Sequence, residues 1–211
     1  MNVVIIGAGG QARVVYEILH HDQQVNIVAF VDKELHEKEE NINGIPVRGG
    51  LSVLPNVIEK NRVKGAIIAI GDNQVRENYY EMIRKMGLEM VNAIHQTSYC
   101  ASGVKLGSGL TIAMGALVST GAKIGNNTII NTGTIIEHDN DIGDHVHIAP
   151  GCSLAGKVTV KQGTFIGIGT VVKDFITIGA NVIIGAGSVV LDDIPDNMVA
   201  VGTPAKVIKP R

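Results

Sequence analysis

The sequence predicts an α/β domain followed by a solenoid of short parallel strands, and three observations lead to this fold class. A glycine-rich turn over residues 7–12 follows an apolar strand at the N-terminus. Aliphatic residues recur at every sixth position through the second half of the chain. Glycine accounts for 26 of 211 residues, and aromatic residues for only 3%. This composition favours a repetitive architecture with many tight turns.

The N-terminal half carries the pattern of a βαβ unit. An apolar strand is expected over residues 3–6, the turn 7–12 (GAGGQA) follows it, and an amphipathic helix is expected over 14–20. A second strand, 27–31, ends in Asp32. A glycine turn at a helix N-terminus brings backbone N–H groups up to a phosphate, and an acidic residue about twenty positions further on completes such nucleotide-binding units.

This pattern predicts half of a Rossmann fold, which suits a mononucleotide. A dinucleotide fold needs two such halves, and about 90 residues precede the repeat, so NAD is the less favoured alternative. Another interpretation is that the glycines only close a tight turn. A third strand over 65–70 and a helix over 74–86 are expected next. The predicted domains are 1–94 and 95–211.

The second half is a repeat with a period of six residues. Fifteen successive positions, six residues apart and without an insertion, are aliphatic. They are Leu106, Ile112, Val118, Ile124, Ile130, Ile136, Ile142, Ile148, Leu154, Val160, Ile166, Val172, Ile178, Ile184 and Val190. A small residue often follows, so each hexad is interpreted as a short strand and a turn with the aliphatic side chain pointing inward. Cys152 occupies a small inward position and is expected to be a core thiol.

These hexads resemble those of the hexapeptide-repeat acyltransferases, in which [LIV]-G-x-x-x-x units form a left-handed parallel β-helix. Three hexads make one coil in that family, so the resemblance implies five coils of eighteen residues here. The segment 201–206, VGTPAK, resembles the C-terminal ending of the same family. Periodicity by itself does not determine the handedness, which is therefore implied by the resemblance alone.

The combination of a small α/β domain with such a β-helix resembles the nucleotide-sugar and sialic-acid-type acetyltransferases of bacterial surface-glycan pathways. The motifs that carry the resemblance are the turn 7–12, Asp32, residues 69–73 (AIGDN) with Arg76, residues 136–139 (IEHD), Ile142-Gly143 and His147. The resemblance implies acetyl-CoA-dependent N-acetylation of a nucleotide-linked 4-amino-4,6-dideoxy sugar, with a UDP-sugar favoured.

The resemblance also implies roles for individual residues. His138 is expected to be the general base, supported by Asp139. The residues expected to bind acetyl-CoA are His147, Gly156, Ile168 and Ala186. The residues expected to bind the nucleotide sugar in the α/β domain are Gly9, Gly10, Gln11, Asp32, Lys33 and Gly71.

The spacing of the repeat supports His138 independently. The residue lies two positions after the inward Ile136, at a corner where side chains can face outward. One coil of eighteen residues further on is Gly156, which leaves room for a thioester and whose N–H can stabilise an oxyanion. Histidine has an unperturbed pKa of about 6.5, so it can accept a proton near neutral pH. A surface histidine that merely hydrogen-bonds to its neighbours is the alternative.

Three other functions stay open at this point. The same base acting on a hydroxyl would make a sialic-acid O-acetyltransferase. His138, His145 and His147 would be the ligands of a β-helix zinc hydratase of the carbonic-anhydrase type, although their spacing differs from that family and His145 is expected at the surface. The third alternative is a trimeric scaffold without enzymatic activity.

Composition and charge limit the partners. A net charge of −2 argues against a nucleic-acid clamp, and no run approaches the roughly 18 apolar residues of a membrane span. We expect acetyl-CoA as co-substrate, no metal, no nucleic-acid or membrane partner, and a cytoplasmic location. Apolar residues at non-inward positions leave surface to cover, which predicts a homotrimer with the acetyl-CoA site between subunits. These residues are Ile129, Ile135, Val171, Ile183 and Val189.

Overall fold

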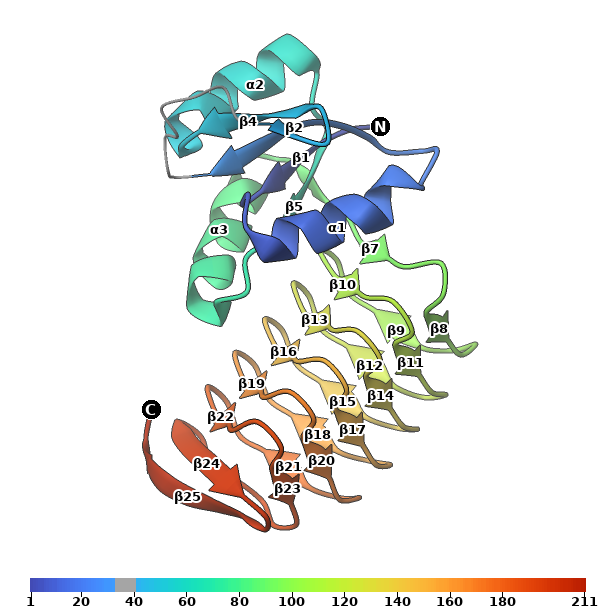
Figure 1. The fold of residues 1–211 in the computed structure, drawn as a ribbon, viewed down its shortest axis with the longest axis vertical. Helices are drawn as coiled ribbons and strands as arrows, with labels where there is room; N and C mark the ends of the chain where they lie inside the picture. The colour runs from blue at the N-terminus through green and yellow to red at the C-terminus, as the bar shows by residue number, and fades with distance from the viewer. Residues whose placement is uncertain (33–40) are drawn as a thin grey trace. The chain divides into compact units, whose positions relative to one another are not determined.

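The computed structural model describes residues 1–32 and 41–211 (Figure 1). The chain forms two compact units, Met1–Ala93 and Ile94–Arg211. Lys33, one of the residues expected to bind the nucleotide sugar, lies outside the described residues. No helix in the described part of the chain has the length and apolar character needed to cross a membrane.

The first unit is a sheet with helices on both faces. Its strand order is β3-β4-β2-β1-β5-β6, and all neighbours are parallel except the antiparallel pair β3–β4. Its elements are β1 (Asn2–Ile6), α1 (Gly10–His20), β2 (Asn26–Asp32), β3 (Asn41–Ile42), β4 (Ile45–Gly49), the 3₁₀ helix η1 (Leu51–Val53), α2 (Leu54–Asn61), β5 (Gly65–Ile68), α3 (Asn73–Lys85) and β6 (Glu89–Met90).

Alternation along β1 explains the three layers of this unit. Val3 and Ile5 belong to the core beneath α1, whereas Val4 and Ile6 belong to the core beneath α2 and α3. Successive side chains of a strand point to opposite faces of the sheet. A strand that is apolar at every position is therefore buried on both faces, as is typical of parallel sheets.

The first unit differs from the expected βαβ pattern in two places. Strand β4 and helix α2 were not predicted, because β4 contains Pro46 and α2 is only eight residues long, so neither shows a clear apolar period. Helix α1 begins at Gly10 rather than at residue 14. Gly9 precedes it in an extended conformation, so the glycine turn leads directly into the first helical turn.

The second unit is a parallel β-helix with three faces (Figure 1). Face 1 contains β7 (Ala93–Ile94), β10 (Thr111–Ile112), β13 (Ile129–Ile130), β16 (His147–Ile148), β19 (Phe165–Ile166), β22 (Ile183–Ile184), β24 (Met198–Gly202) and the antiparallel β25 (Ala205–Pro210). Face 2 contains β8 (Tyr99–Cys100), β11 (Leu117–Val118), β14 (Ile135–Ile136), β17 (Ser153–Leu154), β20 (Val171–Val172) and β23 (Val189–Val190). Face 3 contains β9 (Lys105–Leu106), β12 (Lys123–Ile124), β15 (Asp141–Ile142), β18 (Thr159–Val160) and β21 (Thr177–Ile178).

The inward aliphatic residues form the core of the β-helix. Equivalent residues of successive coils pair in register, as Ile112 does with Ile130 and Ile130 with Ile148. Of the fifteen predicted inward residues, all except Leu106 are at most 2% exposed. Leu106 is 36% exposed because β9 is the terminal strand of face 3. The β-helix also begins earlier than predicted, at β7 and β8.

Two residues expected at the surface are buried. Ile129 is 1% exposed, and its paired neighbours on the adjacent strands, Thr111 and His147, are buried as well. His145 is 7% exposed, and its Nδ1 lies 2.8 Å from the side-chain nitrogen of Asn127. The period of the sequence identifies outward positions, but it does not specify which outward side chains are buried.

Cys152 is expected to resist alkylation in the folded protein. Its side chain is fully buried, its Sγ lies 3.1 Å from the Gly167 carbonyl oxygen, and burial raises the pKa of the thiol. Because only an accessible thiolate reacts, iodoacetamide should modify Cys152 about a hundredfold more slowly than in denatured protein. Mass spectrometry of the peptides measures this, with the less buried Cys100 as internal comparison. Equal rates at the two thiols would contradict the core assignment.

Candidate functional site

A cavity of about 310 Å³ opens at the carboxyl ends of β1, β2 and β5. Because β1 lies between β2 and β5, the chain winds away from it in both directions, and open α/β sheets bind ligands at such a point. Apolar side chains that no sequence pattern singled out, among them Leu51, Val75 and Tyr79, line one part of it. Five of the six residues expected to bind the nucleotide sugar also line it, namely Gly9, Gly10, Gln11, Asp32 and Gly71.

Different physical constraints account for the presence of glycine at the individual positions of the turn. Gly7 has a φ of +109°, and a Cβ there would lie 2.7 Å from the carbonyl oxygen of Ala69, so the packing requires glycine. At Gly9 and Gly10 a Cβ would meet no heavy atom within 4 Å. Glycine at these two positions keeps the space beside the N-terminus of α1 open, where backbone N–H groups favour a phosphate.

Two polar side chains border this space. The Asp32 carboxylate accepts a hydrogen bond of 2.7 Å from the backbone N–H of Ala8, which ties the end of β2 to the glycine turn. The Nε2 of Gln11 is buried and has no hydrogen-bond partner among the described residues. A buried amide donor beside a cavity is suited to a polar ligand, because leaving it unpaired is unfavourable.

The side chain of Arg76 anchors the loop after β5, which lines part of the cavity. Its side chain is buried, and its Nη1 donates to the carbonyl oxygens of Ile70 and Gly71, both at 3.2 Å. Burial lowers the pKa of Arg76 to about 10, against the opposing effect of the nearby Asp72 carboxylate, so the guanidinium stays charged at neutral pH. This charge anchors the loop after β5, which supplies Gly71 to the cavity.

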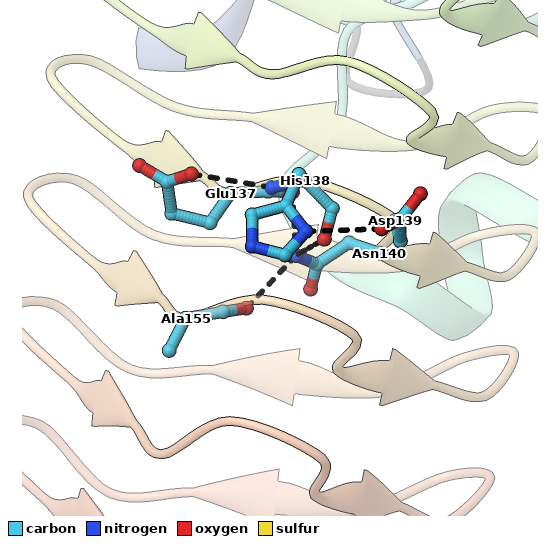
Figure 2. A network of polar contacts seen from close by, with 5 residues as sticks. All are labelled: Glu137, His138, Asp139, Asn140 and Ala155. Atoms are coloured by element: carbon cyan, nitrogen blue, oxygen red, sulfur yellow. Dashed lines mark hydrogen bonds and ion pairs between the residues drawn. The ribbon is translucent and has the colours of Figure 1, made fainter.

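In the second unit, His138 lies at the corner between faces 2 and 3, in the loop that joins β14 to β15 (Figure 2). Its Nδ1 lies 3.0 Å from Oδ2 of Asp139, and the two side chains are 52% and 53% exposed. A carboxylate at Nδ1 favours the tautomer with the proton on that nitrogen. The lone pair of Nε2 is then available to accept a proton.

Glycines on the two adjacent coils make room for this pair. A Cβ at Gly156 would lie 2.6 Å from Nε2 of His138, and a Cβ at Gly121 would collide with Oδ1 of Asp139. The backbone N–H of Lys157 donates to the His138 carbonyl oxygen at 2.9 Å, so the two coils stack in register at this corner. The imidazole therefore lies against the backbone of Gly156, in agreement with the spacing of the repeat.

The other residues expected to bind acetyl-CoA do not join this corner within one chain. Ile168, which is 55% exposed, and Ala186 lie in loops between face 1 and face 2, at the opposite edge of face 2 from His138. His147 belongs to β16 on face 1, is buried, and has its Nε2 3.3 Å from the side-chain nitrogen of Asn131.

The same separation bears on the zinc alternative. His138, His145 and His147 lie at a corner of faces 2 and 3, at a corner of faces 3 and 1, and on face 1, respectively. Across residues 1–32 and 41–211, no group of three His, Cys, Asp or Glu side chains is arranged to hold a metal ion. Within one copy of the chain, these three histidines are therefore too far apart around the β-helix to bind one zinc ion.

Comparison with known families and structures agrees with both units. Residues 2–83 match the PglD N-terminal domain, and residues 157–192 match the bacterial transferase hexapeptide repeats. A histidine-to-asparagine variant of perosamine N-acetyltransferase from Caulobacter crescentus, in complex with CoA and GDP-perosamine, is 37% identical with a TM-score of 0.93 over 99% of this chain and 97% of that chain. A comparison with curated protein sequences gives no match.

Two further structures share the whole architecture. The acetyltransferase domain of PglB from Neisseria gonorrhoeae, in complex with acetyl coenzyme A, is 29% identical with a TM-score of 0.89, covering 98% of each chain. WeeI from Acinetobacter baumannii is 25% identical with a TM-score of 0.80, covering 99% of this chain and 100% of that chain.

These matches define the class of protein, which is a hexapeptide-repeat acetyltransferase with a left-handed parallel β-helix. The match of the N-terminal domain, and the 37% identity to the perosamine N-acetyltransferase over nearly the full length, identify the family within this class. The chain belongs to the nucleotide-amino-sugar N-acetyltransferases that have a PglD-type N-terminal domain. The fold class and the family that the sequence resembled are thereby confirmed.

Replacing Arg76 by methionine is expected to destabilise the first unit. The carbonyl oxygens of Ile70 and Gly71 would lose a charged donor in a buried place, which costs about 1–3 kcal/mol of unfolding free energy. Urea denaturation measures the loss. Lys85→Met, at an exposed position of the same helix, is the matched control and should change stability by less than about 0.5 kcal/mol. Equal effects of the two variants would contradict the anchoring role.

Proposed function

We propose that this enzyme transfers the acetyl group of acetyl-CoA to the amino group of a nucleotide-linked 4-amino-4,6-dideoxy sugar, in bacterial surface-glycan biosynthesis. The observation that carries this proposal is the His138–Asp139 pair, whose free Nε2 lies against the backbone of Gly156. The relatives crystallised with CoA, acetyl-CoA and GDP-perosamine support the donor and the class of acceptor.

The proposed division of labour follows the two units. Residues 1–94 bind the nucleotide through the cavity beside the glycine turn, and residues 95–211 carry out acetyl transfer. The open space at Gly9 and Gly10, together with the N-terminus of α1, suits a diphosphate. The buried amide of Gln11 and the carboxylate of Asp32 supply polar contacts for the rest of the nucleotide.

His138 is the proposed general base. Its Nε2 accepts the proton that the sugar amine loses as its nitrogen bonds to the acetyl carbon, and returns a proton to the CoA sulfur as the carbon–sulfur bond breaks. Asp139 holds the ring in the required tautomer. The N–H of Gly156, which makes no hydrogen bond among the described residues, is the proposed donor to the acetyl oxygen.

A homotrimer completes the proposed site. Outward residues of face 2 are mostly apolar, and Tyr99, Leu117 and Val171 are 62%, 44% and 46% exposed. The equivalent row of face 3 contains Lys105, Lys123 and Asp141 instead. The separated residues expected to bind acetyl-CoA lie at the two edges of face 2. A second copy packed against this face would place its own residues between those edges. An active monomer would contradict this part of the proposal.

A thiol-release assay with acetyl-CoA and a panel of acceptors tests the reaction. The panel contains a UDP-4-amino-4,6-dideoxy sugar, which the sequence favours, GDP-perosamine, the ligand of the 37% identical relative, and free sialic acid. We expect turnover on one nucleotide amino sugar and a loss of about 10²–10⁴-fold in kcat with His138→Ala. Turnover on sialic acid alone would indicate O-acetylation. Wild-type activity of the variant would overturn the assignment of the base.

Gly156→Ala is expected to remove activity without unfolding the protein. The φ of Gly156 is not in the left-handed region, so alanine fits the backbone, but its Cβ would lie 2.6 Å from Nε2 of His138 and push the ring aside. We expect kcat to fall about tenfold or more at an unchanged melting temperature. In a His138→Ala background there is no ring to displace, so the same substitution should have little further effect. Full activity of Gly156→Ala would contradict the proposed arrangement.

A further inference from the structure

Asn140 ends the loop that carries His138 (Figure 2). Its side chain points into the β-helix and is 1% exposed. Its Nδ2 donates to the carbonyl oxygen of Glu137 at 2.6 Å and to that of Ala155, on the next coil, at 2.9 Å. Glu137 directly precedes His138, and Ala155 directly precedes Gly156, so one amide group holds the backbone on both sides of the proposed site.

Similar bonds recur inside the β-helix, where hydroxyl groups make them. Thr128, Thr134 and Thr164 each donate to a carbonyl oxygen fifteen residues further on, at 2.9, 3.0 and 2.6 Å. Asn140 occupies the same position of its hexad, and its bond to Ala155 spans the same fifteen residues. The hydroxyl of Thr170 lies near both equivalent carbonyl oxygens, those of Gly167 at 2.7 Å and Gly185 at 3.2 Å, and must share one hydrogen between them. The two hydrogens of the Asn140 amide allow one full hydrogen bond to each carbonyl.

The asparagine carries a cost that a threonine would not. Its Oδ1 is buried and has no hydrogen-bond partner among the described residues. An unpaired buried acceptor is unfavourable, and a threonine at this position would make the bond to the next coil without burying an amide oxygen. What the asparagine adds in return is its simultaneous hold on two carbonyl groups beside His138 and Gly156.

We propose that Asn140 is a positioning residue for acetyl transfer. It acts by holding the Glu137 and Ala155 carbonyls together, which fixes the His138 imidazole against the Gly156 backbone. Asn140 is buried and has no direct contact with substrate in this proposal. The inference rests on the proposed role of His138 as the base. Without the amide, the ring and the N–H of Gly156 lose their common alignment, and proton transfer depends strongly on such alignment.

The test compares Asn140→Val and Asn140→Thr, which have nearly the same shape but differ in the hydroxyl donor. The assay is thiol release from acetyl-CoA with GDP-perosamine or the UDP-4-amino sugar, whichever supports turnover. We expect Asn140→Val to lower kcat about tenfold or more, with both KM values within about twofold of wild type. Asn140→Thr restores only the bond to Ala155, and its kcat should lie between those of wild type and Asn140→Val. Should the valine variant not fold, Asn140→Ser and Asn140→Ala make the same comparison.

Thr164→Val is the matched control for a purely structural role. It removes a donated hydroxyl bond of the same kind, and an accepted bond of 3.0 Å from the Val182 N–H, at the corner between faces 3 and 1, away from His138. We expect it to lower the melting temperature as Asn140→Val does, but to leave kcat within about twofold of wild type. An equal loss of kcat in both valine variants, or a wild-type kcat in Asn140→Val, would overturn the positioning role.

His138→Asn, measured alone and combined with Asn140→Val, separates this inference from the proposed function. If Asn140 acts through His138, the double variant should lose little more activity than His138→Asn alone. Full activity of His138→Asn would overturn the base and the positioning role together. An inactive His138→Asn beside a fully active Asn140→Val would overturn only the role of Asn140.

Discussion

In-register stacking of successive coils is the constraint on which the second unit depends. Backbone N–H groups donate to carbonyls of the next coil, as Ile129 does to Val146 and Ser153 to Thr170. Residues one coil apart therefore lie directly above one another, and each column must accommodate the side chains of all its members. Where a side chain lies over the backbone of the adjacent coil, that coil needs a residue without a Cβ, and Gly156 beside His138 satisfies this condition.

The two units present their candidate ligand-binding groups by different means. In the first unit, reversal of the winding direction about β1 creates a cavity, and its polar edge is held by a few anchored side chains such as Asp32 and Arg76. In the second unit, no such crevice between strands is needed, because the corner loops project from a rigid stack. The proposed base, His138, gains its orientation from its own neighbour, Asp139, and its surroundings from the next coil.

The three faces of the β-helix have different chemistry although the repeat is regular. Face 2 exposes Tyr99, Leu117 and Val171, face 3 exposes charged residues such as Lys123, and face 1 buries His147. The inward positions determine the fold, so the outward positions are free to differ between faces. An apolar face edged by candidate site residues on both sides is the basis of the proposal that the acetyl-CoA site lies between copies of the chain.

The sequence by itself determined the period of six, the glycine turn and the alignment of His138 with Gly156, because a rigid repeat converts a fixed spacing along the chain into a fixed spacing in space. Only the tertiary structure decided the burial of Ile129 and His145, the added β4 and α2, and the amide contacts of Asn140. The period identifies positions one coil apart, but it specifies neither the burial of their outward side chains nor the hydrogen bonds that an individual side chain makes, and it does not extend to the first unit. The eighteen-residue coil also relates Ile168 to Ala186 and places both at another corner than the proposed base, whereas the burial of outward side chains follows only from the packed structure.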